Sequence, residues 1–426
     1  MYQLQLSAPL RGRIRQVLAT LLVTIAAACA DSPAGDAQHA LVRDSAGIRI
    51  VENAPPDEST PLWSLAETPD LVIESAPDGE FTLHRVRRAR FLSDDRIVVH
   101  QSPFELLWFD ATGILLNRNG GSGDGPAESL SVVRVDLLAG DSLMAISKRP
   151  VSLKIFNPDG GFVRSVAAPV PLSAVIFGRL GTSAWAGISF GGESPPARTE
   201  MFREIFHVVR YGSDLGSADT LLALGANLLY GDRNGSVSVP GGPRGHFALH
   251  SGIVVAGDSE TYELKVFGSE GELRQIIRNS MPNPVEARLI GSARPRSRPA
   301  GAAEEGGPRS SIEAPVMETA PAYDWVFVAN DGGVWVRRIA GPDEETVRTN
   351  ILYSSSAFTS TSGPLWVAEG LDGQEWHVYD QQGILRARAL IPPRFRPTEI
   401  TASRILGVWK DELDVESIRV FRLIRS

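Results

Sequence analysis

From residue 46 onward, short runs of apolar, β-branched and aromatic residues alternate with turns rich in Gly, Asp, Asn and Pro. No long window of the sequence repeats with the 3.6-residue period of an amphipathic helix. Short, regularly spaced runs bounded by turn residues are typical of strands. The pattern therefore predicts a protein that is almost entirely β.

A repeated turn motif gives the period of this pattern. Four segments consist of an aromatic residue, three further residues, a glycine and an apolar strand, and they begin at Phe109, Phe156, Phe267 and Tyr379. The glycine supplies the positive φ that a tight turn between antiparallel strands needs. A degenerate copy begins at Tyr211. Phe421 follows a similar strand, but the chain ends before a turn.

A second series of turns alternates with the first, at Asp94-Asp95, Gly140-Asp141, Gly181, Ser251-Gly252, Asp331-Gly332-Gly333 and Ser403-Arg404. Two turns per period give four strands per unit, and six such units predict an all-β, six-bladed β-propeller with four antiparallel strands per blade.

The last blade lacks its outermost strand. Because an unpaired edge at the seam would expose backbone donors and acceptors, we expect the N-terminal strand Gly47–Asn53 to pair with residues 416–422 and close the ring.

Residues 86–166 and 376–423 resemble the bacterial six-bladed β-propeller lipoproteins, whose organisation is similar to that of NHL-repeat and TolB-like propellers. The resemblance is carried by Phe91–Val99, by Gly120–Glu128 and by Ile405–Phe421. In the middle stretch, Ala127 and Ser129 replace the Gly and Phe of the usual Gly-Pro-Gly-Glu-Phe. The resemblance implies the fold and says little about activity.

The N-terminal segment resembles a bacterial lipoprotein signal peptide. Three arginines are followed by the apolar run Val17–Ala28, which is too short to span a bilayer, and then by Cys29. Ala26 stands where such signals usually have Leu, so ordinary signal cleavage remains an alternative. We expect residues 1–28 to be a signal peptide, Cys29 to carry a lipid, and residues 29–45 to form a flexible tether.

The predicted propeller spans residues 46–426 and contains two stretches that do not fit its repeating pattern of strands and turns. Residues 279–320 are rich in Pro, Ala, Arg and Gly, and residues 340–373 form a second insertion within the fifth blade. Long insertions in compact domains are either functional lids or flexible linkers, and we favour a linker for the first.

Composition narrows the class of protein and its location. Of 426 residues, 43% are hydrophobic and 22% are charged, as in ordinary globular chains. The formal net charge is −8, and it becomes −11 when the signal segment with its three arginines is removed, which argues against a nucleic-acid partner. A single cysteine excludes intrachain disulfides. We expect an extracytoplasmic monomer that is lipid-anchored to the cell envelope.

Three local motifs suggest chemistry that their surroundings do not favour. Ser189 lies in a Gly-x-Ser-x-Gly match, but Gly-Glu-Ser-Pro-Pro follows instead of the helix that a nucleophile elbow needs. His246 and His250 are spaced for zinc on a helix, yet their segment is predicted to be a strand. Asp124 and Glu128 lack the spacing of a calcium loop, although bound calcium is left open as a cofactor. We predict no catalytic, metal or cofactor residue.

A cluster of arginines before and within the first innermost strand is the strongest candidate for a binding site. Arg88 and Arg90 fall on one face of that strand, beside Arg87, and could line an anion-binding mouth of the central channel. Alternatively, these arginines pair with the acidic residues of positions 70–80 and of neighbouring loops.

Together, these patterns predict a non-enzymatic binding or scaffolding module of the cell envelope that uses a propeller face for a protein, peptide or glycan partner. The alternative is a propeller hydrolase or lactonase with a metal ion in the central channel, for which Asp324 and Asn330 lie near an innermost strand.

Overall fold

The computed structural model describes residues 40–130, 132–148, 151–167, 174–190, 196–232, 235–239, 242–250, 252–280, 315, 317, 321–338, 374–392 and 394–425. These residues form 28 strands and one short 3-10 turn, η1 (Ala139–Asp141). The prediction of an almost entirely β protein is therefore confirmed for the described part of the chain.

Three sheets contain strands that follow one another in chain order, each antiparallel to the next. The first consists of β5 (Val86–Phe91), β6 (Ile97–Gln101), β7 (Glu105–Phe109) and β8 (Leu115–Gly120). The second consists of β9 (Val132–Leu137), β10 (Leu143–Lys148), β11 (Val151–Phe156) and β12 (Phe162–Ala167). The third consists of β13 (Ala174–Leu180), β14 (Ala184–Phe190), β15 (Glu200–Gly212), β16 (Ala218–Asp232) and β17 (Gly235–Ser238).

The fourth sheet adds an N-terminal hairpin to a unit of four antiparallel strands. The unit is β18 (Gly245–His250), β19 (Ile253–Asp258), β20 (Glu263–Phe267) and β21 (Leu273–Asn279). The hairpin is β1 (Ala40–Ser45) and β2 (Ile48–Asn53), and β2 pairs in parallel with β21.

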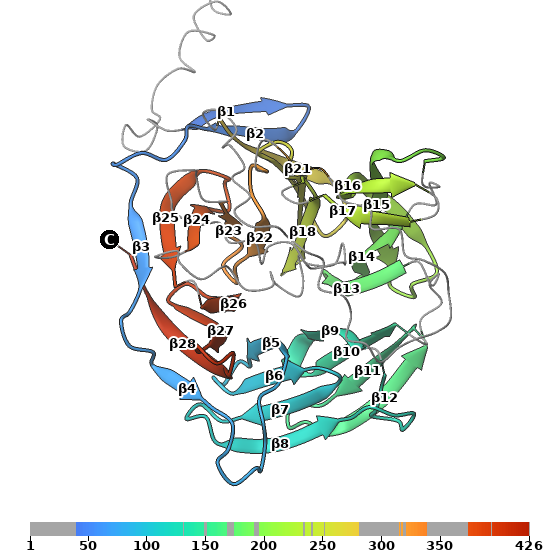
Figure 1. Cartoon of the computed structure of the whole chain (residues 1–426), viewed down its shortest axis with the longest axis vertical. Helices are drawn as coiled ribbons and strands as arrows, with labels where there is room; N and C mark the ends of the chain where they lie inside the picture. The colour runs from blue at the N-terminus through green and yellow to red at the C-terminus, as the bar shows by residue number, and fades with distance from the viewer. Residues whose placement is uncertain are drawn as a thin grey trace, which may run out of the picture. The chain divides into compact units, whose positions relative to one another are not determined.

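The fifth sheet has nine strands and contains two antiparallel units. One is β22 (Trp325–Val328), β23 (Val334–Arg337), β24 (Gln374–Tyr379) and β25 (Leu385–Ile391). The other is β26 (Phe395–Ile400), β27 (Arg404–Lys410) and β28 (Glu416–Ile424), with β4 (Leu71–Ile73) paired to β28. Between them, β3 (Leu62–Leu65) pairs with both β25 and β28. Figure 1 shows all the sheets arranged around a common centre, which defines an all-β propeller.

Each predicted turn series falls between the expected strands. The five aromatic–glycine turns connect β7 to β8, β11 to β12, β15 to β16, β20 to β21 and β24 to β25. Gly113 has a φ of 89°, which a residue with a side chain rarely adopts. In the degenerate copy, Leu215 takes the equivalent position with a φ of 63°, so this turn forms without its glycine.

The prediction for the strand that completes the last blade is wrong. Gly47–Asn53 contributes β2, which pairs with β21 and not with residues 416–422. The strand next to β28 is β4, in which Ile73 lies opposite Ile418. Because β4 ends shortly before β5 begins, the strand that completes the last unit leads directly into the first unit.

Asn53 explains why β2 is held elsewhere. Its side-chain amide donates to the carbonyl oxygens of Arg278 and Gly383 at 3.1 and 2.9 Å, and its Oδ1 accepts from the backbone N–H of Leu385 at 2.8 Å. The Asn53 side chain is only 1% exposed. A buried amide with these three partners fixes the end of β2 between β21 and the turn that precedes β25.

The boundaries expected outside the propeller change in one place. Residues 40–45 belong to the expected flexible tether but form β1, because each of them pairs with a residue of β2. The signal segment, Cys29 and the insertion at 340–373 lie outside the described residues, as does most of the insertion at 279–320.

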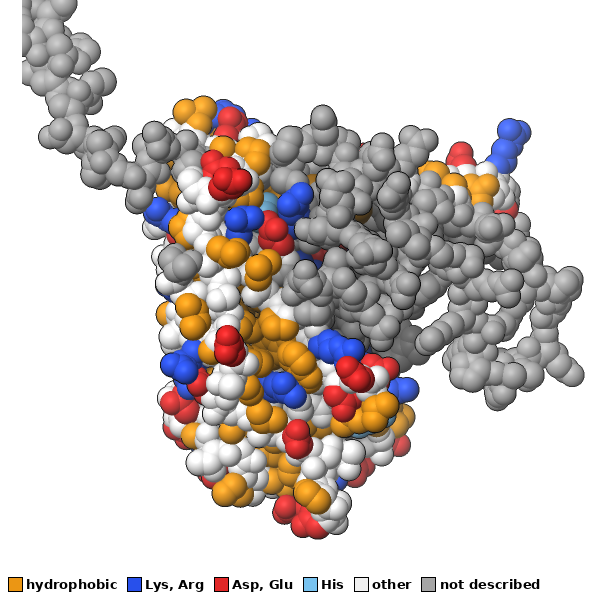
Figure 2. Space-filling view, turned by 60° about the vertical axis from the view of Figure 1, so that its left-hand side comes forward, with side chains coloured by type: hydrophobic (Ala, Val, Ile, Leu, Met, Phe, Trp, Pro, Cys, Tyr) orange, Lys and Arg blue, Asp and Glu red, His pale blue; other side chains and the backbone are white. Residues whose placement is uncertain are grey.

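Buried apolar clusters join consecutive units. Five clusters lie between the units that start with β5, β9, β13, β18, β22 and β26, taken in chain order. A sixth cluster contains residues of β27, β28 and β4 together with residues of β5, β6 and β7. The last unit is therefore packed against the first, and apolar burial runs through every interface between units. Figure 2 shows the side that carries β3 and β4, where charged side chains interrupt the apolar ones.

Side chains from the last unit also bond the backbone of β5 across this seam. Glu416 accepts from the N–H of Val86 at 2.7 Å, and Glu399 accepts from the N–H of Phe91 at 2.7 Å. Arg396 donates to the carbonyl oxygens of Val86 and Arg87 at 2.6 and 3.2 Å. These bonds satisfy backbone groups that the free edge of an innermost strand would otherwise leave unpaired.

Replacement of Glu399 by Ala should destabilise the fold strongly. Glu399 is 3% exposed and also holds Arg90 in an ion pair at 3.1 Å, so its loss leaves a buried guanidinium and a buried N–H without this partner. We expect the free energy of unfolding to fall by about 3–5 kcal/mol in urea denaturation. The control is Glu270→Ala, which removes an exposed partner of Arg210 and should change stability by less than about 1 kcal/mol. Equal effects of the two variants would contradict the role of Glu399 at the seam.

Candidate functional site

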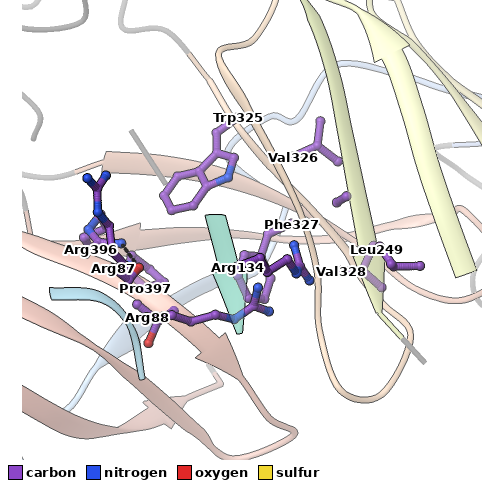
Figure 3. Close-up of a pocket in the computed structure, with 12 residues that line it drawn as sticks. Arg87, Arg88, Arg134, Leu249, Trp325, Val326, Phe327, Val328, Arg396 and Pro397 are labelled. Atoms are coloured by element: carbon purple, nitrogen blue, oxygen red, sulfur yellow. Dashed lines mark hydrogen bonds between the residues drawn. The ribbon is translucent and has the colours of Figure 1, made fainter. Parts of the chain in front are cut away.

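A pocket lies where five of the innermost strands converge. Its lining comes from β5, β9, β18, β22 and β26, and β22 supplies Trp325 to Val328 (Figure 3). The cationic lining residues are Arg87, Arg88, Arg134 and Arg396. With a volume of about 30 Å³, the cavity has room for roughly two water molecules or one small polar group.

A bulge in β5 explains how two adjacent arginines reach the same pocket. In a regular strand, neighbouring side chains point to opposite faces. Here Val86 pairs with Gln101 and Arg88 pairs with His100, so Arg87 is an extra residue between two successive pairs. Such a bulge redirects side chains, and both Arg87 and Arg88 line the pocket. Similar register shifts occur in β9, β13 and β26, each against its neighbouring strand.

The pocket lining carries donors that have no partner among the described residues. They are Nε of Arg88, Nε of Arg134 and Nε1 of Trp325. Arg134 is 5% exposed and Trp325 is 3% exposed, so solvent does little to satisfy these groups. Because a buried donor without an acceptor is unfavourable, an ordered water or a ligand atom that supplied an acceptor here would be stabilised.

The charges around the pocket favour an anion. Burial lowers the pKa of Arg88 well below its usual value, and the nearby Arg134 and Arg90 lower it further. Burial also lowers the pKa of Arg134, despite the opposing attraction of Asp136. The pKa of Arg396 falls to about 10, again mainly through burial. A bound anion would offset both the burial and the mutual repulsion of these guanidinium groups.

Arg90, the third arginine of the predicted mouth, has different surroundings. It lies two residues further along β5 than Arg88 and is 6% exposed. Its guanidinium pairs with Asp136 and with Glu399, each at 3.1 Å. Although burial opposes the charge, these two carboxylates raise the pKa of Arg90. Glu399 also accepts from the amide of Asn330 at 2.7 Å, and Asp136 lies 3.7 Å from the guanidinium of Arg134, so Arg90 belongs to a network of ion pairs and hydrogen bonds that reaches the pocket lining.

The structure thus divides the predicted mouth into two parts. Arg87 and Arg88 line the pocket, whereas Arg90 belongs to the ion-pair network next to it. The expectation that the arginines pair with acids in neighbouring loops also differs from what is observed, since the partners of Arg90 come from the innermost strands β9 and β26.

Three lining residues were not predicted from the sequence. Arg134 follows two valines in β9, Arg396 lies near the start of β26, and Trp325 begins β22. Trp325 also belongs to an apolar cluster between two units, where it packs against Trp376 at a centroid distance of 5.1 Å. Each of these residues lies at or near the start of an innermost strand, and this position is the feature of the sequence that could have identified it.

The other candidate motifs form strands. Ser189 lies in β14, opposite His207 of β15. His246 and His250 lie at opposite ends of the strand segment of β18, so about 13 Å of backbone separates them. Asp324 pairs with Arg337 at 2.7 Å. Among the described residues, no group of three His, Cys, Asp or Glu side chains is placed to share a metal ion.

Comparisons with known proteins find solved structures with a likeness in fold, and they do not assign the chain to a family. No family model and no curated protein matches the chain. A Bacteroides fragilis protein named as exported is 10% identical with a TM-score of 0.46, covering 88% of this chain and 99% of that chain. A DUF4221 family member from Bacteroides vulgatus is 9% identical with a TM-score of 0.46, covering 85% and 99%. A virginiamycin B lyase from Staphylococcus aureus is 10% identical with a TM-score of 0.39, covering 85% and 100%.

At these identities and scores the likenesses carry no functional argument, and the propeller assignment rests on the sheet topology described above. In the part of the chain that the structure describes, no helix is both long enough and apolar enough to cross a bilayer.

The cationic pocket should make stability depend on pH through His100. Burial, reinforced by Arg87 and Arg88, lowers the pKa of His100 to about 3, whereas the unfolded residue titrates near 6.5. The unfolded chain therefore binds a proton first as the pH falls. Stability should decrease from about pH 6.5 toward pH 3, by up to ~1.4 kcal/mol per pH unit for this group.

Urea denaturation at several pH values between 7 and 4 tests this expectation. His100→Gln should flatten the pH dependence relative to the wild type. His84→Gln, a control whose side chain stays exposed in the folded protein, should leave the slope unchanged. The same slope in wild type and His100→Gln would show that His100 does not titrate in this way.

Proposed function

We propose that the protein is a six-bladed propeller of the cell envelope that binds, without catalysis, a partner bearing an anionic group in its central pocket. The six-blade count treats the nine-stranded sheet as two blades, β22–β25 and β26–β28 with β4, linked by β3. Six predicted turns between first and second strands and six apolar clusters between consecutive units support this count.

One observation carries the binding proposal: three residues that line the pocket each hold a buried donor with no partner among the described residues. Arg88 and Arg134 contribute charged donors and Trp325 a neutral one. Ionised carboxylates offer acceptors only and phosphates offer several, and guanidinium groups bind both strongly. An acidic protein or peptide segment or a charged glycan fits these requirements. Because the chain as a whole has a net negative charge, the local excess of arginine distinguishes this pocket from the rest of the protein as a place for an anion to bind.

Inorganic phosphate provides a direct test of the pocket. Phosphate should raise the melting temperature progressively with its concentration, by an amount equivalent to about 1.4 kcal/mol when the concentration is tenfold above Kd. Sodium chloride at equal ionic strength should not reproduce the effect. The double variant Arg88→Met/Arg134→Met should lose the phosphate response, while Arg164→Met, a change of an exposed residue of β12, should retain it. An equal phosphate response in the double variant would refute an anion site at this pocket.

We further propose that a lipid on Cys29 holds the propeller at the outer side of the cytoplasmic membrane or at the outer membrane. The basic and apolar leader that ends at Cys29 supports this proposal. Cells grown with a clickable palmitate should label the wild-type protein and not Cys29→Ser. Label on the Cys29→Ser protein, or none on the wild type, would exclude the anchor. Total protein on a parallel immunoblot controls for expression.

A further inference from the structure

We infer that the anionic group bound by this pocket belongs to an amphipathic ligand, in which a carboxylate or phosphate monoester is attached directly to an apolar body such as an aromatic ring. The inference rests on the proposed anion site and concerns the half of the pocket that carries no charge.

The pocket has two chemically different sides. Its cations come from β5, β9 and β26, and its apolar lining comes from β18 and β22. On the β22 side lie Val326, Phe327 and Val328, with Leu249 of β18 beside them (Figure 3). Val326, Val328 and Leu249 are already buried in the clusters between units, so Phe327 is the residue of this side that a bound apolar body could still remove from water.

Phe327 marks the place where such a body can bind. The other apolar lining residues named here are buried within the clusters between units, but Phe327 is only half-buried. On the cationic side, Arg87 is exposed and Arg88 is half-buried. The accessible parts of the lining are therefore one aromatic ring and two guanidinium groups, which match an aryl group next to an anion.

The small cavity also restricts the ligand. Its volume of about 30 Å³ is enough for the oxygen atoms of one small anionic group and too small to enclose an aromatic ring beside them. The ring must then remain at the rim, against Phe327. The charged end enters the pocket, where Nε of Arg134 and Nε1 of Trp325 have no partner among the described residues.

Isothermal titration of the mature, unanchored protein (Cys29→Ser) with matched pairs of ligands tests the inference. Benzoate should bind roughly tenfold more tightly than acetate, and phenyl phosphate roughly tenfold more tightly than inorganic phosphate, because each ring buries apolar area. Benzyl alcohol, which has the ring without the charge, should not bind measurably. A dipeptide ending in Phe, with its C-terminus free or amidated, shows whether a peptide carboxylate can be the source of the charge.

Variants separate the two halves of the pocket. Phe327→Ala should abolish the advantage of benzoate over acetate and leave acetate binding within about twofold, and Phe327→Leu should keep part of the advantage. Arg88→Met/Arg134→Met should abolish binding of all four anions. Val163→Ala, at an exposed position of β12, is the matched control and should change nothing.

The outcomes distinguish this inference from the proposed function. Equal affinities for benzoate and acetate in the wild type would overturn the amphipathic ligand while leaving the anion site intact. No binding of any anion would overturn both. Because the comparison of ligands needs only the wild-type protein, it remains decisive if Phe327→Ala does not fold.

Discussion

The fold depends on how the inner edge of β5 is satisfied at the seam between the first and last units. A strand at the edge of a sheet exposes backbone donors and acceptors, and β5 would do so where the ring begins. Glu416, Arg396 and Glu399 bond its backbone from the last unit, and β4 pairs with β28 at the outer side of the same unit. The seam is thus stabilised by the bonds to β5 on its inner side and by the β4–β28 pairing on its outer side, and an apolar cluster lies between these two sets of contacts.

The same seam accounts for the chemistry of the central pocket. Arg396 is committed to the backbone of β5, and Glu399 is committed to Arg90. Arg88 lies two residues before Arg90 on β5, and Arg134 shares Asp136 with Arg90, at 3.7 and 3.1 Å. The arrangement leaves positive charge where it has few protein partners, and natural proteins accept such local instability mainly at sites that bind a ligand.

Much of the fold was predictable from the spacing of turns, because a turn requires particular residues at particular positions. Gly113 and the glycines equivalent to it located the outer hairpins. The strand that completes the last unit was not predictable, since the three residues of β4 give too short a pattern to compete with the longer apolar run of β2. Arg87 and Arg88 were found because they are adjacent in sequence. Arg134, Arg396 and Trp325 were missed because only the ring brings their separate strands together.

Asn53 has a mechanical consequence for any force that acts on the chain ahead of residue 40. In chain order, the β1–β2 hairpin comes before β3 and β4, and Asn53 fixes the end of that hairpin to the backbone of β21 and of the turn before β25. A displacement that enters the chain ahead of residue 40 must disrupt these bonds before it can reach β4. The hairpin therefore takes up such a force before it reaches the short pairing between β4 and β28.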